Sequence, residues 1–371
     1  MKPADLFADI RPYHDDEVPA ALERLMNDDE LLAAIAHFRF PRLSRFLGVL
    51  LKPMIRRALH KRWALVRSVR DVQTEVAHFM EQMIASTTQG VTYSGLEHLE
   101  SGKSYLFISN HRDIAMDPAF VNWGLYKCGL DTVRIAIGDN LLRKPCATEL
   151  MRLNKSFIVK RSAKGPREMM KAFSELSAYI AHSLQEGSSI WIAQKEGRAK
   201  DGDDRTDPAI LKMFYMAGKH QKIPFADYMQ GLNIVPVAIS YEFDPGDEAK
   251  ARELVERAQS GSYEKGEFED IDSIVAGIVG FKGRVHVSIG SPLSQIPDTP
   301  EALAESLDRA IHGQYRLFPS NLLAAGESQG ISEAERQQFA NRIAAMPSEL
   351  QSTARAMYAR PVLNQRQSLE N

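Results

Sequence analysis

The sequence predicts an α/β fold, in which a mixed, largely parallel sheet is flanked by helices and preceded by an N-terminal helical region. Short β-rich runs alternate with helix-length stretches from about residue 105 onward, a pattern typical of parallel strands joined by helices. The first 90 residues contain almost only helical patterns. With 371 residues, of which 44% are hydrophobic, the chain can bury a sizeable core.

These patterns divide the chain into three predicted parts. Residues 1–92 form the N-terminal helical region, residues 93–318 the α/β domain, and residues 319–371 a polar C-terminal helix and tail, whose last ten residues we expect to be frayed. No apolar run approaches the roughly 20 residues that cross a bilayer, so we expect no membrane span.

Periodicity and flanking residues predict the individual elements. We expect strands at 105–108, 133–137, 157–159, 190–192, 234–240 and 285–289, and helices at 15–36, 70–86, 118–127, 166–185, 208–219, 248–259 and 299–312. Asp117 and Asp207 each precede a proline, which predicts two helix N-caps with proline at the first helical position. Pro236 interrupts an apolar strand and predicts a place near a sheet edge or an active-site rim, because proline cannot donate to a ladder.

Charge is distributed unevenly along the chain. In total there are 46 Lys plus Arg and 48 Asp plus Glu, a net charge of −2, which argues against a general polyanion binder. Residues 31–70 nevertheless contain ten basic side chains and no acidic one, which leaves 36 basic and 48 acidic side chains elsewhere, a net charge of −12. The positive charge is therefore concentrated in one segment.

That basic segment has helical periodicity. Apolar residues recur at three-and-four spacing between residues 43 and 59, and Pro53 predicts a break or kink. A basic amphipathic helix can lie in the interface of an anionic membrane. Alternatively, its apolar stripe packs on the α/β domain and its cations face solvent. Nucleic acid ranks last and is not an expected partner, because few aromatic residues are interleaved with the cations.

The most informative segment is the loop after the strand at 105–108, which contains Asn110, His111, Asp113 and Asp117. Ligands of open α/β sheets bind beyond the carboxyl ends of strands. A histidine held by a carboxylate can act as a general base near neutral pH. In the alternative interpretation, Asp117 only caps a helix and His111 is a buried histidine with satisfied hydrogen bonds.

Two other predicted strands also end in charged residues. Lys160 and Arg161 follow the strand at 157–159, and Glu196, Gly197 and Arg198 follow the strand at 190–192. Such cations can bind a phosphate, for which arginine is suited by its bidentate geometry, or they can be solvated surface charges. The histidines have no metal-ligand spacing, so we expect no metal.

In this order, the segments resemble the motifs of the glycerolipid acyltransferase family, the glycerol-3-phosphate and 1-acylglycerol-3-phosphate acyltransferases. The resemblance covers roughly residues 95–245. The matching residues are Asn110, His111 and Asp117 for the first motif, Phe157, Ile158 and Arg161 for the second, Glu196 and Gly197 for the third, and Pro236 for the fourth.

The sequence departs from the family pattern in two motifs. The family usually has four residues between His and Asp, whereas five separate His111 from Asp117, so Asp113 is an alternative partner. The run looks like a bacterial branch of the family, which favours Asp117. The third motif lacks the usual Phe-Pro, and residues 203–208 are similar to a run in soluble plant-type glycerol-3-phosphate acyltransferases, which makes Arg205 a second candidate for contact with phosphate.

The resemblance implies an O-acyltransferase of phospholipid synthesis. It would move a fatty acyl group from acyl-CoA or acyl carrier protein to a hydroxyl of glycerol-3-phosphate or 1-acylglycerol-3-phosphate, with no other cofactor. His111 would be the general base and Asp117 would orient it. The acceptor phosphate would contact Lys160, Arg161, Arg198 and Arg205, and the acceptor would also contact Glu196 and Gly197.

The basic segment extends this expectation to the place of the protein in the cell. Residues 39–70 predict contact with an anionic membrane surface, and hence a cytoplasmic enzyme that is peripheral on the inner face of the cell membrane. Two alternatives remain open. The acceptor can be another lipid, of the ornithine lipid or lipid A type, or the chain can be a non-catalytic membrane-associated binding protein.

Overall fold

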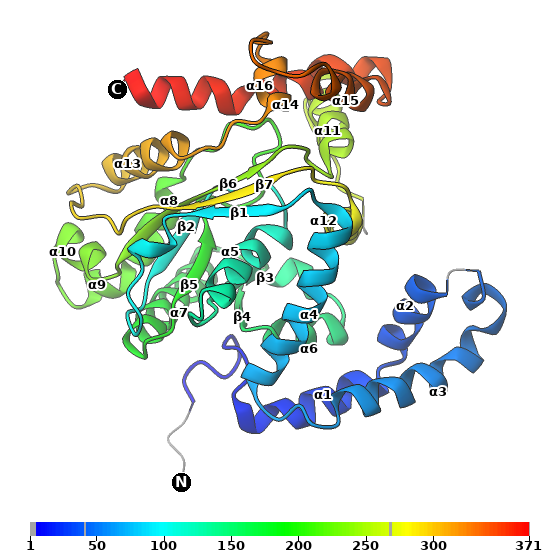
Figure 1. Ribbon diagram of the computed structural model, residues 1–371. Helices are drawn as coiled ribbons and strands as arrows, with labels where there is room; N and C mark the ends of the chain where they lie inside the picture. Colours follow the sequence, from blue (N-terminus) through cyan, green and yellow to red (C-terminus); the bar gives the residue numbers. More distant parts are fainter. Residues whose placement is uncertain (1–4, 41, 267–268, 371) are drawn as a thin grey trace. The chain divides into compact units, whose positions relative to one another are not determined.

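The computed structural model describes residues 5–40, 42–266 and 269–370 of the chain, which separates into two compact units (Figure 1). Unit 1 consists of residues 1–79 and 134–172, and unit 2 of residues 80–133 and 173–371. The N-terminal helices thus share a unit with a later segment of the chain. None of the helices in the described part is long and apolar enough to cross a membrane.

Unit 1 is mainly helical. Its elements are η1 (Asp15–Glu17), α1 (Val18–Asn27), α2 (Asp29–Arg39), α3 (Ser44–Trp63), the start of α4 (Val69–Thr87), β3 (Arg134–Gly138), η3 (Asp139–Leu141), α6 (Pro145–Leu153), β4 (Ser156–Val159) and the start of α7 (Pro166–Gln185). The two strands pair in parallel, with Ile137 opposite Ile158. The predicted helix at 70–86 is confirmed, whereas the one predicted at 15–36 is divided at Asp28 into α1 and α2, and α6 is not apparent from the sequence pattern.

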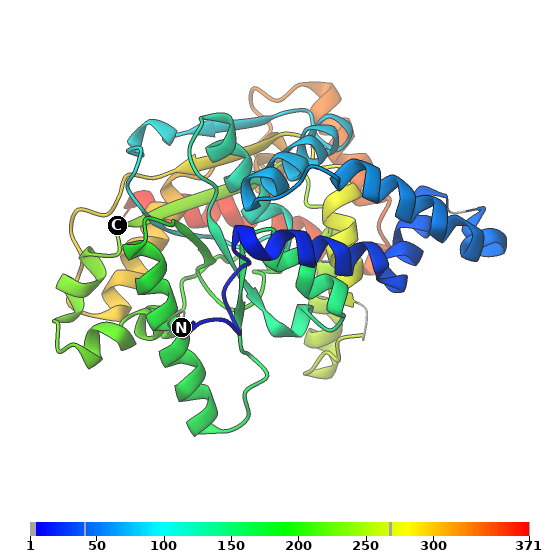
Figure 2. The same cartoon turned by 90° about the horizontal axis from the view of Figure 1, so that it is seen from below.

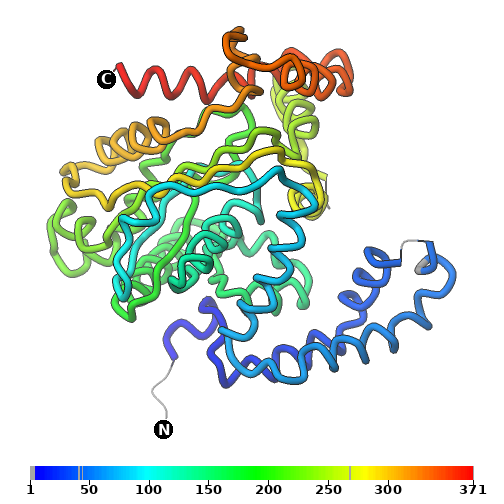
Figure 3. Tube along the Cα trace, in the orientation of Figure 1, coloured from blue at the N-terminus to red at the C-terminus, as the bar shows by residue number. Residues whose placement is uncertain are grey.

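Helices α2 and α3 lie side by side in unit 1 (Figure 3). Leu32 and Ala36 of α2 pack against Ile55 of α3, and the half-buried Leu51 and Leu59 extend this contact. The chain leaves helical geometry at Leu47 (φ −124°, ψ 18°), and not at Pro53 as predicted. Only part of the predicted apolar stripe of α3 is therefore used in packing.

Unit 2 contains five neighbouring strands of the sheet, in the order β1-β7-β6-β2-β5. The strands are β1 (Val91–Ser94), β2 (Leu106–Ser109), β5 (Ile190–Ala193), β6 (Ile234–Tyr241) and β7 (Val285–Ile289). The β1–β7, β2–β5 and β2–β6 pairs are parallel, and the β6–β7 pair is antiparallel. This confirms the predicted mixed, largely parallel sheet. Strand β1 is too short and too exposed on alternate residues to have been predicted.

Helices cover both faces of the unit 2 sheet. The helices of unit 2 are the end of α4, η2 (Leu96–His98), α5 (Met116–Lys127), most of α7, α8 (Pro208–Phe214), α9 (Met216–His220), α10 (Phe225–Gln230), α11 (Asp247–Ser260), α12 (Glu269–Val279), α13 (Pro300–Gly313), α14 (Pro319–Ala324), α15 (Glu333–Ala344) and α16 (Ser348–Glu370). The predicted helix at 208–219 is divided at Tyr215.

The side chains of β6 alternate between these two faces, as the period of a strand requires. Ala238 packs against Ile311 of α13, whereas the ring of Tyr241 lies 5.9 Å from that of Phe120 on α5. Figure 2, viewed from below, shows α16 behind the strands on the α13 side. All eight residues of β6 are buried, which explains its unbroken apolar composition.

Two predictions about prolines need correction. Pro236 is not at a sheet edge, because β6 lies between β7 and β2. Its carbonyl faces β7 and accepts from Gly290 N (2.8 Å). The ladder between β6 and β7 covers only residues 237–241 of β6, so the missing N–H of Pro236 lies just beyond the end of that ladder. Asp117 is inside α5 and Ala115 is the N-cap, whereas Asp207 is the predicted N-cap of α8.

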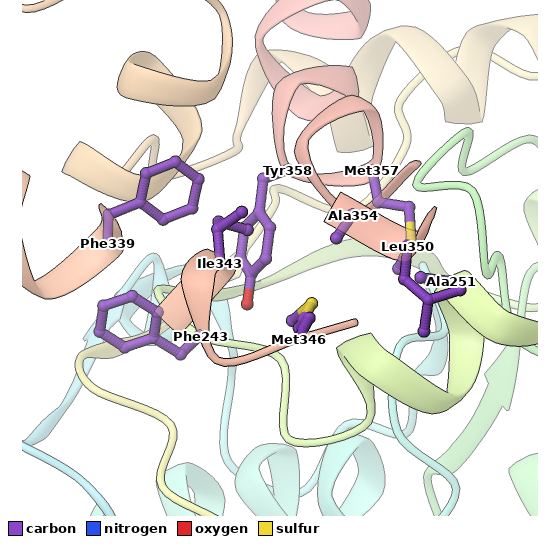
Figure 4. Close-up of a cluster of buried hydrophobic side chains, with 9 residues drawn as sticks. All are labelled: Phe243, Ala251, Phe339, Ile343, Met346, Leu350, Ala354, Met357 and Tyr358. Atoms are coloured by element: carbon purple, nitrogen blue, oxygen red, sulfur yellow. The ribbon is translucent and has the colours of Figure 1, made fainter. Parts of the chain in front are cut away.

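The C-terminal prediction is also wrong for the last ten residues. Helix α16 continues to Glu370, with Val362 buried and Gln365 Nε2 donating to the Tyr315 carbonyl (2.8 Å). Its apolar face belongs to a core cluster with α11 and α15 (Figure 4). The cluster consists of Phe243, Ala251, Phe339, Ile343, Met346, Leu350, Ala354, Met357 and Tyr358. This packing keeps a polar-looking segment in helical order.

Candidate active site

The candidate site lies at the carboxyl ends of three strands of unit 2. Strands β5, β2 and β6 are parallel neighbours, with Ser109 opposite both Ala193 and Val237. Parallel strands end at the same edge, so the segments that follow them meet there. These segments are the loop 110–115, the loop 194–207 and the chain from Tyr241 to α11.

His111 and Asp117 form a pair in this loop. His111 Nδ1 lies 2.8 Å from Asp117 Oδ2, and the Asp117 side chain is fully buried. The His111 side chain is 14% exposed and its ring lies edge-on to Trp191, with 5.8 Å between ring centroids. Since a carboxylate accepts the Nδ1 proton, Nε2 is the atom that can take a proton from a substrate.

Backbone donors hold Asp117 in place. Its Oδ2 also accepts from Arg112 N (2.6 Å) and Asp113 N (2.9 Å). The loop is tied to β6 by Asn110, whose side chain accepts from Ile239 N (2.8 Å) and donates to Ile239 O (3.0 Å). The two residues of the Asn-His pair therefore have different contacts, because Asn110 ties the loop to β6 and His111 pairs with Asp117.

Asp113 is not the partner of His111. Its Oδ1 accepts from Ala115 N (3.0 Å) and Met116 N (2.8 Å), which caps the start of α5. Burial, together with the neighbouring Asp117 carboxylate, raises the pKa of Asp113 to about 6. Of the two candidates predicted from spacing, the structure pairs His111 with Asp117.

A buried ionic cluster supports the same loop. Lys250 Nζ donates to the Arg112 carbonyl (2.6 Å) and pairs with Asp244, and Arg112 also contacts Asp244 (3.3 Å). Although burial alone would raise it, the pKa of Asp244 lies well below its usual range because Lys250 and Arg112 are adjacent. Arg112 donates further to the Ala199 carbonyl (2.9 Å), which joins two loops of the site.

The loop after β5 lies against the His111 loop. Gln194 N donates to Ser109 O (2.8 Å), and Ala199 N donates to His111 O (3.0 Å). Gly197 has φ +76° and no atom within 4 Å of a Cβ built on it, so Glu196 and Gly197 form an open rim. Arg198 contacts Ser273 Oγ of α12 (3.4 Å). The structure therefore brings Glu196, Gly197 and Arg198 to the neighbourhood of His111.

The other predicted phosphate ligands are divided between the two units. Lys160 and Arg161 directly follow β4 in unit 1, where Arg161 N donates to Asp139 Oδ1 (3.1 Å). Arg205 is in unit 2, but its guanidinium contacts Asp203 (3.1 Å) and Gln367 of α16 (3.1 Å), not the His111 loop. Their roles stay predictions. No group of three or more His, Cys, Asp or Glu within the described ranges has an arrangement that could hold a metal.

Comparison with known proteins decides the class of this site. The family model described as Acyltransferase matches residues 90–240, which include His111, Asp117 and the loop after β5. Residues 90–240 belong to the acyltransferase family. The predicted resemblance is thereby confirmed at the level of the family, whose members transfer acyl groups. The comparison with curated proteins finds no match.

Among solved structures, one similar to this chain is the crystal structure of the 1-acyl-sn-glycerophosphate (LPA) acyltransferase PlsC from Thermotoga maritima. The two chains are 14% identical, the TM-score is 0.41, and the match covers 79% of this chain and 96% of that chain.

Three residues of the site were not singled out in the sequence. Tyr241, Asp244 and Lys250 follow the residues matched by the acyltransferase family model. Tyr241 OH donates to Asp117 Oδ1 (2.7 Å), and burial raises the pKa of its phenol well above the usual range. No local pattern marks these residues, because their partners lie far away in the sequence.

Proposed function

We propose that the chain transfers a fatty acyl group from a thioester, acyl-CoA or acyl carrier protein, to a hydroxyl of a phosphate-bearing glycerol. Glycerol-3-phosphate and 1-acylglycerol-3-phosphate are the proposed acceptors. The observation that carries the proposal is the His111–Asp117 pair (2.8 Å), located at the carboxyl ends of parallel strands inside an acyltransferase domain.

The proposed reaction uses His111 as general base. Nε2 takes the proton of the acceptor hydroxyl while its oxygen attacks the thioester carbonyl. The new C–O bond forms, the C–S bond breaks, and the leaving thiolate takes the proton back from the imidazolium. Asp117 keeps Nδ1 protonated and stabilises the imidazolium as it forms, which would supply about 10²–10⁴-fold together with the base.

The acceptor phosphate is assigned to arginine and lysine side chains. Arg198 is the favoured contact, since Ala199 N donates to His111 O (3.0 Å) and so joins its loop to the base. Glu196 and Gly197 would form the rim that contacts the glycerol hydroxyls. Lys160 and Arg161 remain further candidates for contact with the phosphate. The proposed reaction needs no cofactor beyond the acyl donor.

We further propose that residues 39–70 bind an anionic membrane surface, which would make the protein peripheral on the cytoplasmic face of the cell membrane. Phe46, Val49 and Leu50 of α3 are 87%, 82% and 71% exposed, which is unusual for large apolar side chains gathered on one helix. Exposed cations, among them Arg45 and Arg57, lie on the same helix. This combination favours a lipid surface over simple solvation.

The reaction is tested with purified protein supplied with acyl-CoA or acyl carrier protein and with each acceptor in turn. We expect acceptor-dependent thiol release and a new glycerolipid, with at least a hundredfold loss of kcat in H111A. H182A, on the exposed part of α7, is the matched control and should keep wild-type activity. Near-full activity of H111A would exclude His111 as the base. Activity only with ornithine lipid or lipid A precursors would change the acceptor, and vesicle binding without thiol release would favour a non-catalytic protein.

A further inference from the structure

The carboxylate of Asp117 is held at both oxygens. Oδ2 accepts from His111 and from two backbone N–H groups, as described above, whereas Oδ1 accepts from Tyr241 OH at 2.7 Å. Asp117 is fully buried and Tyr241 is 8% exposed, so water cannot replace this phenol freely. Among the described residues, the Tyr241 hydroxyl is therefore the group that donates a hydrogen bond to Asp117 Oδ1.

Tyr241 is well placed to fix the angle of the carboxylate. It is the last residue of β6, a strand that is buried along its whole length, and it pairs there with Val285 of β7. Its ring packs on Phe120 of α5, the helix that carries Asp117. The hydroxyl is thus anchored on a rigid element, as an orienting group requires.

We propose that Tyr241 is a positioning residue for the Asp117–His111 pair. The proposal rests on the proposed function. The phenol draws negative charge toward Oδ1 and fixes Oδ2 toward His111 Nδ1, so that His111 Nε2 keeps its direction toward the acceptor. Tyr241 takes no proton in the reaction, since burial raises the pKa of its phenol and keeps it a donor.

A purely structural role would predict something different. A buried phenol that only satisfies a carboxylate contributes to stability wherever it stands, without an effect on proton transfer. Tyr358 provides that comparison within the same unit: it is 5% exposed, and its OH donates to Asp247 Oδ2 at 2.7 Å. Tyr241→Phe and Tyr358→Phe therefore each delete a phenol–carboxylate bond of the same length, and Tyr358→Phe also removes the oxygen that accepts from Asp244 N (3.0 Å) and Arg342 Nε (3.1 Å).

The test compares the stability and the acyl-transfer kinetics of these two variants. We expect Y358F to lose at least as much stability as Y241F, because it loses more hydrogen bonds, but only Y241F to lose kcat, by about tenfold, with KM changed less than twofold. Without the phenol, more negative charge faces His111, so the acid limb of the kcat profile of Y241F should move to higher pH. A Y241F profile that coincides with that of Y358F would refute the proposal.

A second readout does not depend on catalysis. In NMR titrations, the His111 ring, assigned with H111A, should titrate at higher pH in Y241F than in wild type. Incorporation of 3-fluorotyrosine at position 241 strengthens the donor without loss of volume and should shift the titration to lower pH, even if Y241F folds poorly. Unchanged His111 titration in these proteins would overturn the positioning role. Absence of thiol release from wild type would instead overturn the proposed function.

Discussion

At the scale of the residue, the environment assigns different tasks to two neighbouring aspartates. Asp117 and Asp113 are both close in sequence to His111, and spacing alone left both as partners. In the structure, Asp117 Oδ2 lies 2.8 Å from His111 Nδ1, and Asp113 Oδ1 accepts from Met116 N at 2.8 Å. The distinction depends on the turn of the loop at the start of α5, where backbone N–H groups of two loop residues point at Asp117.

The raised pKa of Asp113 predicts a pH-dependent stability. Its carboxyl titrates near 3.8 in the unfolded chain and at about 6 in the folded one, so the folded chain holds the extra proton between these values. The contribution of this proton to the free energy of unfolding is complete below pH 4 and is lost by about pH 6. The loss amounts to about 3 kcal/mol. Asp113→Asn should lack this loss and be more stable than wild type at pH 7.

Urea unfolding at pH 4 and pH 7 measures the effect. Asp131→Asn, which removes the same charge at an exposed position, is the control and should behave as wild type at both pH values. If the stability of D113N relative to wild type is no greater at pH 7 than at pH 4, the Asp113 carboxyl is not titrating as the structure requires.

At the scale of the element, α12 depends on a glycine for its contact with the loop 110–115. A Cβ built on Gly277 would lie 2.1 Å from Asp113 Oδ2. The aspartate cannot move aside easily, because it is short and held by Ala115 N and Met116 N. Helix α12 can therefore approach the loop only where it has no side chain.

Gly277→Ala should destabilise unit 2 by about 1–3 kcal/mol through this overlap. Gly48→Ala is the matched change, because Gly48 lies in α3 with nothing within 4 Å of its added Cβ. At that position the better helix propensity of alanine should stabilise unit 1 by up to about 1 kcal/mol. Opposite signs in denaturant unfolding support the close approach, and equal effects of both variants would contradict it.

Sequence periodicity predicted elements well where apolar residues recur at the period of the helix or strand. The expected helix at 166–185 and strand at 285–289 match the observed bounds. Periodicity failed for the end of α16, where fraying is expected from the many Gln, Ser and Arg residues, because the order of this helix depends on the cluster around Met357. It also failed for the start of α5, because the cap of this helix comes from Asp113 and not from the Asp-Pro pair.

At the scale of the whole molecule, the uneven charge is the feature with functional weight. The chain has a net charge of −2, yet residues 31–70 contain ten basic and no acidic side chains. Each cation near an anionic leaflet contributes about 1 kcal/mol before screening by salt. Membrane binding through this segment should therefore depend on both salt and the exposed apolar residues.

Vesicle sedimentation tests this dependence. We expect the protein to sediment with phosphatidylglycerol vesicles at low salt, less at 0.5 M NaCl (about a 4 Å Debye length), and little with phosphatidylcholine alone. Replacing both Phe46 and Leu50 with Ser should weaken binding, whereas Leu369→Ser, also at an exposed apolar position, should not. Undiminished binding of the double variant would place the lipid contact elsewhere.

The sequence by itself determined the class of fold, the basic segment and the residues of the acyltransferase motifs. These features are local, since periodicity, charge and motif spacing depend on neighbours along the chain. The tertiary structure decided which carboxylate holds His111 and where Arg205 points, and it added Tyr241, Asp244 and Lys250 to the site. Those assignments depend on strand order, because β6 and the chain after it meet the β2 loop only through the pairing of β2 with β6, two strands more than a hundred residues apart in sequence.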